Sequence, residues 1–361
     1  MNWWNIYLIV FFFATLLALV LTPFFRRIAI WTNTLDKPAV QNHKNHKIAT
    51  PLMGGFALCS AWILTLLIGI YSPVFLAKQN FSQLIIDNLS GVFDTKSRLI
   101  AIIIGAVLIT LLGFIDDRRN ISAKLKFLGQ IVIAAFVVFY GDIKISLFIN
   151  SPIINSILAV LWIVTIINAI NFFDNMDGLA VGIAAIAFTF FTIAAIIYNH
   201  NFIACLGAAG IGTTIGFWFY NQSPASIFMG DAGSHFLGYA LGVTGALTTY
   251  YQENITLTPL SVLIPLFILA IPLFDLLSVI IIRVKNNKPI YIGDNNHISH
   301  RFFKMGMSRK NAVSCVHLLS IIIGLSVLPL LWGNLLTTIV CLLQACIILI
   351  LVSVLQYTAQ K

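Results

Sequence analysis

Apolar runs of 17 or more residues recur from one end of this chain to the other, and they constrain its fold more than any other feature. Each run is long enough to cross the hydrocarbon core of a bilayer, which is about 30 Å thick. Because lipid offers the backbone no hydrogen-bond partner, runs of this length suit only helices. Charged residues make up 9% of the 361 residues, whereas a soluble domain carries about a quarter. We therefore predict an all-α, multi-pass integral membrane protein that forms a single domain over residues 1–361.

Charge and hydropathy together predict the topology. Loops that alternate between eleven spans place 17 of the 21 Lys and Arg residues on one side, which the positive-inside rule makes cytoplasmic. The N-terminus is then outside and the C-terminus inside, and the net charge of +9 is a topology signal, so we expect no nucleic-acid partner. The first span has no charged segment before it, and we expect it to be retained rather than cleaved as a signal peptide. The predicted spans are residues 3–23, 52–71, 97–114, 124–141, 153–170, 179–198, 202–220, 234–250, 259–283, 312–331 and 335–356.

Acidic residues concentrate on the predicted cytoplasmic side. Eleven of the twelve are Asp, and Asp275 is alone within a predicted span. Short carboxylates gathered on one face of a membrane suit a divalent cation, because Mg²⁺ commonly binds one or two carboxylates together with substrate phosphates. Seven map to the cytoplasmic loops or the adjoining helix ends, namely Asp36, Asp116, Asp117, Asp174, Asp177, Asp231 and Asp294.

The stretch GFIDDRRN, residues 113–120, carries two adjacent carboxylates, Asp116 and Asp117. They repel each other unless a cation or a shared proton compensates. The neighbouring Arg118 and Arg119 leave a second interpretation open, in which the motif is only a solvated cluster of charges.

The stretch NAINFFDNMDG, residues 168–178, places three Asn and two Asp at the end of an apolar run. If the helix continues at about 100° per residue, Asn168, Asn171 and Asn175 fall within about 60° of arc. Asp174 lies beside them. Lipid cannot satisfy amides, so this stripe must face protein or water. It predicts a ligand site, with hydrogen bonding between helices as the alternative.

Two further motifs follow on the same side. Asp231, in the stretch FMGDAGSHFLGY, precedes an apolar run, so its carboxylate is expected near a helix N-terminus, where it binds a ligand or only caps the helix. In the stretch HISHR, His297 and His300 share one face of a helical turn and Arg301 follows. Arg and protonated His suit phosphate. Zinc and anionic lipid head groups are the alternatives.

These four motifs, in this order and spacing, resemble those of the polyprenyl-phosphate N-acetylhexosamine-1-phosphate transferase superfamily. The chain is more similar to its undecaprenyl-phosphate GlcNAc-1-phosphate transferases than to its phospho-N-acetylmuramoyl-pentapeptide translocases. The resemblance implies ten or eleven helices around a cytoplasmic cleft in the bacterial inner membrane. It also implies transfer of a sugar 1-phosphate from a UDP-HexNAc to undecaprenyl or another polyprenyl phosphate, with release of UMP, for synthesis of cell-envelope glycans. The pattern is compatible with a homodimer.

The resemblance also implies roles for individual residues. Asn171 and Asp231 would bind Mg²⁺, with Mn²⁺ as the alternative. Asp116 and Asp117 would lie at the lipid-phosphate side, Asp116 as a base or as a group that positions the lipid phosphate or a Lys. The phosphates would be held by Lys126, His297, His300 and Arg301. The uridine pocket would be lined by Asp174, Asn175, Met176, Asp177 and Phe228, with Asn221 nearby.

The chain departs from the family pattern at two positions that touch substrate-binding loops. Asn175 stands where a Gly is usual, and Ser299 stands where a further His is common. The identity of the sugar is therefore open, with a muramoyl-pentapeptide donor as the alternative within the family. A secondary transporter, for which Asp275 close to Pro272 is the favouring feature, and a non-catalytic lipid-binding protein are the alternatives outside it.

Overall fold

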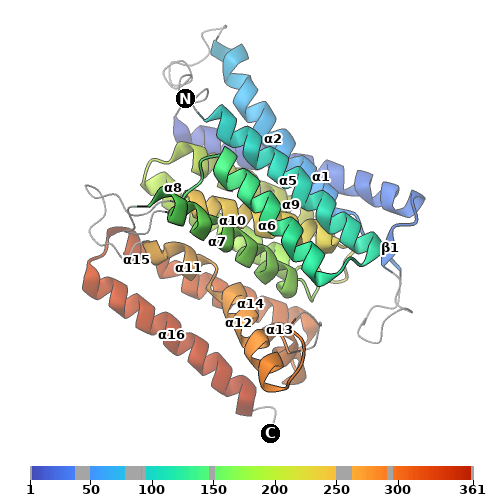
Figure 1. Ribbon diagram of the computed structural model, residues 1–361, viewed down its shortest axis with the longest axis vertical. Helices are drawn as coiled ribbons and strands as arrows, with labels where there is room; N and C mark the ends of the chain where they lie inside the picture. The colour runs from blue at the N-terminus through green and yellow to red at the C-terminus, as the bar shows by residue number, and fades with distance from the viewer. Residues whose placement is uncertain are drawn as a thin grey trace.

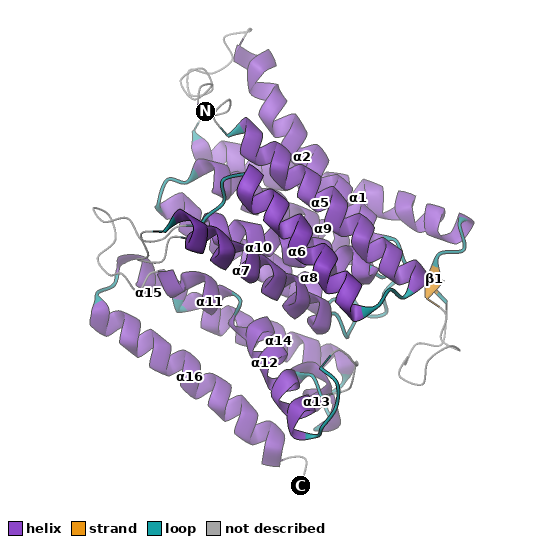
Figure 2. Ribbon diagram, viewed as in Figure 1, coloured by secondary structure: helices purple, strands orange, loops and turns teal. Residues whose placement is uncertain are grey.

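The protein is a bundle of helices with a short two-stranded antiparallel ribbon (Figures 1 and 2). The computed structural model describes residues 2–36, 49–77, 91, 95–145, 151–248, 262–290 and 296–358. The ribbon pairs β1 (Leu35–Asp36) with β2 (Thr50–Pro51). The helices are α1 (Trp3–Trp31), α2 (Gly54–Ala77), α5 (Lys96–Arg119), α6 (Ala123–Tyr140), α7 (Pro152–Phe173), α8 (Leu179–Ile197), α9 (Asn201–Asn221), α10 (Gly230–Leu247), α11 (Ile264–Ile268), α12 (Ala270–Lys285), α13 (Ile298–Lys304), α14 (Arg309–Leu325), α15 (Val327–Trp332) and α16 (Leu335–Thr358).

The prediction of a helical protein with several spans long enough to cross a membrane is confirmed. Within the described part of the chain, nine stretches of helix are long and apolar enough to cross a membrane. They are α1, α2, α5, α6, α7, α8, α9, α14 together with α15, and α16. The other two predicted spans, 234–250 and 259–283, correspond to α10 and to α11 with α12, although residues 249–250 and 259–261 lie outside the described residues. The count of eleven and the orientation of the termini stay predictions.

The helix α10 is the centre of the bundle. It packs against α2, α5, α7, α8 and α9, and its residues from Ala232 to Ala246 are buried. Glycines allow two of these neighbours to approach closely. A Cβ at Gly113 of α5 would lie 2.3 Å from the backbone oxygen of Asp231, and one at Gly238 would lie 2.5 Å from the Cα of Ile167 on α7. These close approaches bring the polar ends of α5, α7 and α10 together.

The C-terminal helices form a second group beside α7 and α8, with α16 at its outer edge (Figure 1). The predicted span 259–283 is interrupted at Leu269, which separates α11 from α12. Pro272 lies in the first turn of α12, where its missing N–H leaves no intrahelical bond unmade. The outer helices α1 and α16 expose large apolar side chains, as expected of surfaces that face lipid, among them Trp4, Phe12, Leu16, Leu336, Ile347 and Ile350.

Candidate active site

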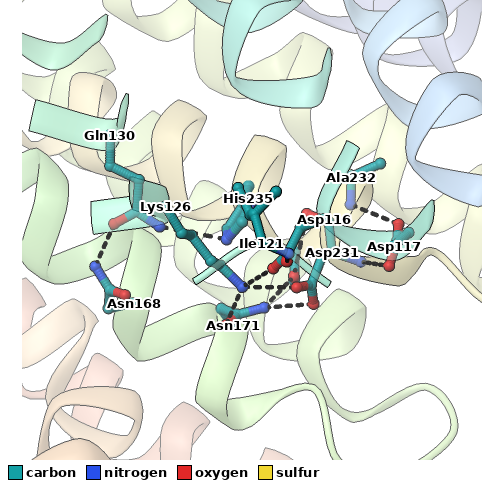
Figure 3. Close-up of polar contacts among 11 residues, drawn as sticks. Asp116, Asp117, Ile121, Lys126, Gln130, Asn168, Asn171, Asp231, Ala232 and His235 are labelled. Atoms are coloured by element: carbon teal, nitrogen blue, oxygen red, sulfur yellow. Dashed lines mark hydrogen bonds and ion pairs between the residues drawn. The ribbon is translucent and has the colours of Figure 1, made fainter. Parts of the chain in front are cut away.

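Four side chains from four helices meet at one end of the bundle (Figure 3). The Lys126 ammonium on α6 lies 2.7 Å from Asp116 Oδ2 on α5 and 2.6 Å from Asp231 Oδ2 on α10. It also donates to Asn171 Oδ1 on α7 at 3.4 Å, and Asn171 Nδ2 donates to Asp231 Oδ1 at 2.9 Å. Asn171 and Asp231 are thus in direct contact, and their binding of a shared ion stays a prediction. We call these four residues the carboxylate–lysine cluster.

The start of α6 explains how a lysine comes to lie inside an apolar bundle. Ser122 caps the helix by accepting from Leu125 N, so the helix begins at Ala123 and Lys126 lies on its first turns. Lys124, two residues earlier, points to the exposed surface. A lone ammonium would be costly to bury, whereas one between two carboxylates is compensated. Of the two lysines at the start of this span, Lys126 therefore belongs to the cluster and Lys124 does not.

Asp117 has a different place from Asp116. Its Oδ1 accepts from Asp231 N at 2.9 Å and its Oδ2 from Ala232 N at 3.1 Å, so it caps the N-terminus of α10. The cap interpretation considered for Asp231 is therefore wrong, because a residue of α5 supplies the cap and the Asp231 side chain faces Lys126. The motif GFIDDRRN is helical through Arg119, so its two adjacent carboxylates point in different directions and reach different partners.

A second polar layer lies one helical turn beneath the cluster. Gln130 follows Lys126 by four residues and His235 follows Asp231 by four, and the Gln130 Nε2 and His235 Nε2 atoms are 3.3 Å apart. Asn168 Nδ2 donates to Gln130 Oε1 at 2.7 Å (Figure 3). Gln130 and His235 are fully buried. Sequence reasoning missed both of them, although their spacing of four residues from the charged pair was a usable signal.

Within the stretch 168–178, the helix ends earlier than the predicted stripe of Asn168, Asn171 and Asn175 requires. The helix α7 ends at Phe173, so Asn168 and Asn171 remain on it while Asn175 lies in the following turn. Burial raises the pKa of the Asp174 carboxyl to about 8, and the charges of Asp231 and Asp117 act in the same direction. At neutral pH, Asp174 is therefore largely protonated and can donate a hydrogen bond as well as accept one.

Three residues predicted at the uridine pocket, Asn221, Asp177 and Phe228, make hydrogen bonds that fix the segment between α9 and α10. Asn221 Oδ1 accepts from Gly178 N at 3.1 Å, and its Nδ2 donates to Ile227 O at 3.0 Å. Asp177 Oδ2 accepts from Ala225 N at 3.1 Å. The backbone of Phe228 bridges to the strand segment through Pro51 O and Gly54 N. Met176 packs against the apolar core. These contacts place the residues around one end of the bundle without showing what they bind.

The His/Arg helix α13 is held by a carboxylate that sequence reasoning did not place in the site. Asp275 on α12 is fully buried, its Oδ2 lies 2.7 Å from His297 Nδ1, and its Oδ1 accepts from Ile298 N at 2.7 Å. Ser278, three residues on, accepts from Arg301 Nη2 at 3.0 Å. Asp275 and Ser278, spaced i and i+3 within the apolar first part of α12, were the sequence signal for these contacts. Asp294, which precedes this motif, lies outside the described residues.

The two remaining members of that motif differ in charge. Burial lowers the pKa of the His300 imidazole to about 4, and Lys304 and Arg309 nearby act in the same direction. At neutral pH, His300 is therefore an uncharged hydrogen-bonding group rather than the cation that the sequence suggested. Arg301 is buried, lies 4.0 Å from Asp275 Oδ1, and its Nε has no partner among the described residues. A buried guanidinium with an unused donor suits a phosphate.

The donors in the carboxylate–lysine cluster suit a hard divalent cation. Oxygens of Asp116, Asp231 and Asn171 converge on one point, now contacted by Lys126 Nζ. No three His, Cys, Asp or Glu side chains are grouped to hold a metal by themselves in the part of the chain that the structure describes. This sparse set of oxygens agrees with the habit of Mg²⁺, which leaves positions for substrate phosphate and water. It does not resemble a closed zinc site.

Fold and site together define a class: a multi-pass membrane protein that gathers carboxylates, amides and basic groups at one end of its bundle. The family described as Glycosyl transferase family 4 matches residues 99–249. A probable undecaprenyl-phosphate N-acetylglucosaminyl 1-phosphate transferase of Bacillus subtilis (strain 168) is 36% identical over 331 residues, which cover 89% of this chain and 84% of the relative. The chain belongs to glycosyl transferase family 4.

More distant relatives point to two kinds of activity. A decaprenyl-phosphate N-acetylglucosaminephosphotransferase of Mycobacterium leprae (strain TN) is 28% identical over 316 residues, covering 81% of this chain and 76% of the relative. A phospho-N-acetylmuramoyl-pentapeptide-transferase of Bacillus subtilis (strain 168) is 32% identical over 258 residues, covering 66% and 72%. The predicted greater similarity to the GlcNAc-1-phosphate enzymes is confirmed.

Proposed function

We propose that this protein transfers N-acetylglucosamine 1-phosphate from UDP-N-acetylglucosamine to undecaprenyl phosphate or another polyprenyl phosphate. An oxygen of the lipid phosphate attacks the β-phosphorus of the donor, the bond from that phosphorus to the bridging oxygen breaks, and UMP leaves. The product is a lipid diphosphate sugar for cell-envelope glycan synthesis. The observation that carries the proposal is the convergence of Lys126, Asp116, Asn171 and Asp231, in a chain similar to polyprenyl-phosphate GlcNAc-1-phosphate transferases.

The proposed chemistry is mainly electrostatic. Asn171 and Asp231 would hold Mg²⁺, or Mn²⁺ in its place, which when bound neutralises charge on the diphosphate. Lys126 contacts oxygens of both residues, so its ammonium would compete with a bound ion, and once displaced it would be able to bind a phosphate oxygen. The Arg301 guanidinium, whose Nε has no hydrogen-bond partner among the described residues, would bind a second phosphate oxygen. The excess of Lys and Arg on one side supports a site that opens to the cytoplasm.

The position of Asp116 favours a supporting role over proton abstraction. Its Oδ2 contacts Lys126 at 2.7 Å and its Oδ1 accepts from Ile121 N at 3.0 Å, so both oxygens are already engaged. The second pKa of a phosphate monoester is about 6, so much of the lipid nucleophile needs no base at neutral pH. Asp116 therefore orients the Lys126 ammonium, one of the two roles that the sequence left open.

Release of UMP tests the proposal directly. We expect purified protein in detergent to release UMP from UDP-N-acetylglucosamine only when Mg²⁺ and undecaprenyl phosphate are both present. UDP-N-acetylmuramoyl-pentapeptide, offered in a parallel reaction, distinguishes the donor within the family. If neither donor released UMP, the proposal would be contradicted, and a transporter or a lipid-binding protein would be favoured instead.

Replacing Asp275 by Asn is expected to reduce the specific activity by about tenfold or more, because charge-assisted hydrogen bonds to His297 and to Ile298 N are weakened together. The loss should appear mainly as a higher KM for the UDP-sugar, since α13 is proposed to hold donor phosphates. Steady-state kinetics with the donor varied measure it. A variant with the KM of the wild type would show that α13 is positioned by its other contacts.

A further inference from the structure

Asn175 and Ser299, the two residues that the resemblance marks as departures from the family pattern, lie in direct contact. Ser299 Oγ on α13 donates to Asn175 Oδ1, in the turn after α7, at 2.6 Å, although 124 residues separate them in the sequence. Asn175 Nδ2 donates to Phe172 O at 3.2 Å, which fixes the amide with its oxygen toward the serine. The two departures are therefore one structural feature, which we call the Asn175–Ser299 contact.

The contact depends on both residue types. Ser299 is fully buried, so a side chain as large as His has no room there unless its neighbour becomes smaller. A Gly at position 175 offers no side-chain acceptor, and it would leave the buried Ser299 hydroxyl without this partner. Either departure alone is thus unfavourable, whereas the two together make a short hydrogen bond.

We propose that the Asn175–Ser299 contact is a positioning pair that sets the distance between the two halves of the donor site. This inference rests on the proposed function. On one side of the contact, α7 and its following turn carry Asn171 and Asp174. On the other side, α13 carries His300 and Arg301. Because the two sides are proposed to bind different parts of one UDP-sugar, their separation controls how well the donor fits, while the lipid acceptor is unaffected.

Other tethers hold α13, but to different helices. Asp275 binds it to α12, and Gln356 of α16, itself buried, donates to Ile298 O at 3.2 Å. Neither of these contacts reaches the turn after α7. Loss of the Asn175–Ser299 contact is therefore expected to shift α13 relative to that turn rather than to unfold it, and Gln356 offers a matched control for a general loosening of α13.

A double-mutant cycle tests the pair. We expect Asn175→Ala to raise the KM for UDP-N-acetylglucosamine about tenfold, because a buried hydroxyl loses its acceptor, with an unchanged KM for undecaprenyl phosphate. Ser299→Ala in the same background should add little, so the two effects are strongly non-additive. Asn175→Ala combined with Gln356→Met should be additive. Additive effects of the Asn175 and Ser299 variants, or equal changes in both KM values, would overturn the proposal.

A swap toward the family pattern gives an independent readout. Ser299→His alone should lower the melting temperature and the activity, since the larger ring is forced into a filled space. Adding Asn175→Gly should recover part of both losses by making room. No recovery in the double variant would overturn the proposal. A wild-type protein that releases no UMP would instead refute the proposed function itself, so the two failures are distinguishable.

Discussion

Replacing Asp231 by Asn is expected to lower UMP release by about a hundred- to a thousandfold while the protein stays folded. Asn has the same shape, but it lacks the charge that lies 2.6 Å from Lys126 Nζ and that is proposed to bind the ion. The fold should survive because Asp117 caps α10 through the backbone N–H groups of Asp231 and Ala232, which the substitution leaves in place. The variant should also need more Mg²⁺ to reach half its maximal rate, which a magnesium titration of UMP release measures.

A matched control for that experiment is Asp142→Asn. Asp142 pairs with Lys144 at 2.5 Å, but 67% of its side-chain surface is exposed, so the pair contributes little. We expect unchanged UMP release and an unchanged magnesium requirement. If Asp231→Asn behaved like this control, the carboxylate–lysine cluster would not be the site of the reaction.

The second large effect is expected from Lys126→Met, which removes the ammonium between Asp116 and Asp231. Two carboxylates are then left close together without a counter-charge, and we expect the free energy of unfolding to fall by about 2 kcal/mol. This is less than for a fully buried pair, because Asp231 keeps 33% of its side-chain surface exposed. Activity should fall by about a hundredfold. Added Mg²⁺ should raise the melting temperature more in the variant than in the wild type, because the ion no longer competes with an ammonium.

Lys124→Met provides the control, since Lys124 lies two residues earlier on the same helix and is exposed. We expect wild-type stability, activity and response to Mg²⁺. Thermal unfolding followed by intrinsic fluorescence, with and without Mg²⁺, compares the two variants. An equal magnesium response in Lys126→Met and in the wild type would contradict the competition between the ammonium and the ion.

Most of the predicted site residues do come together, but their partners could not be deduced. Sequence reasoning placed both Asp116 and Asp117 at the lipid-phosphate side, whereas helix geometry turns Asp116 toward Lys126 and Asp117 toward the backbone of α10. Successive residues on a helix point about 100° apart, so adjacent carboxylates rarely share a partner. Asp275 was singled out by its place inside an apolar span, but its partner could not be deduced, because only the contact between α12 and the start of α13 shows which group compensates this carboxylate.

The sequence by itself determined that this is a helical membrane protein and which motifs carry its polar chemistry. A membrane span is recognised from the hydropathy and charge of about 20 consecutive residues, the length needed to cross a bilayer. Each span can therefore be identified from its own stretch of sequence. Only the tertiary structure decided that Lys126 lies between Asp116 and Asp231, and that Asn175 meets Ser299. Lys126 and Asp231 are 105 positions apart in the sequence, and Asn175 and Ser299 are 124 positions apart. These contacts depend on how closely helices pack, which glycines such as Gly113 permit and which no local pattern specifies.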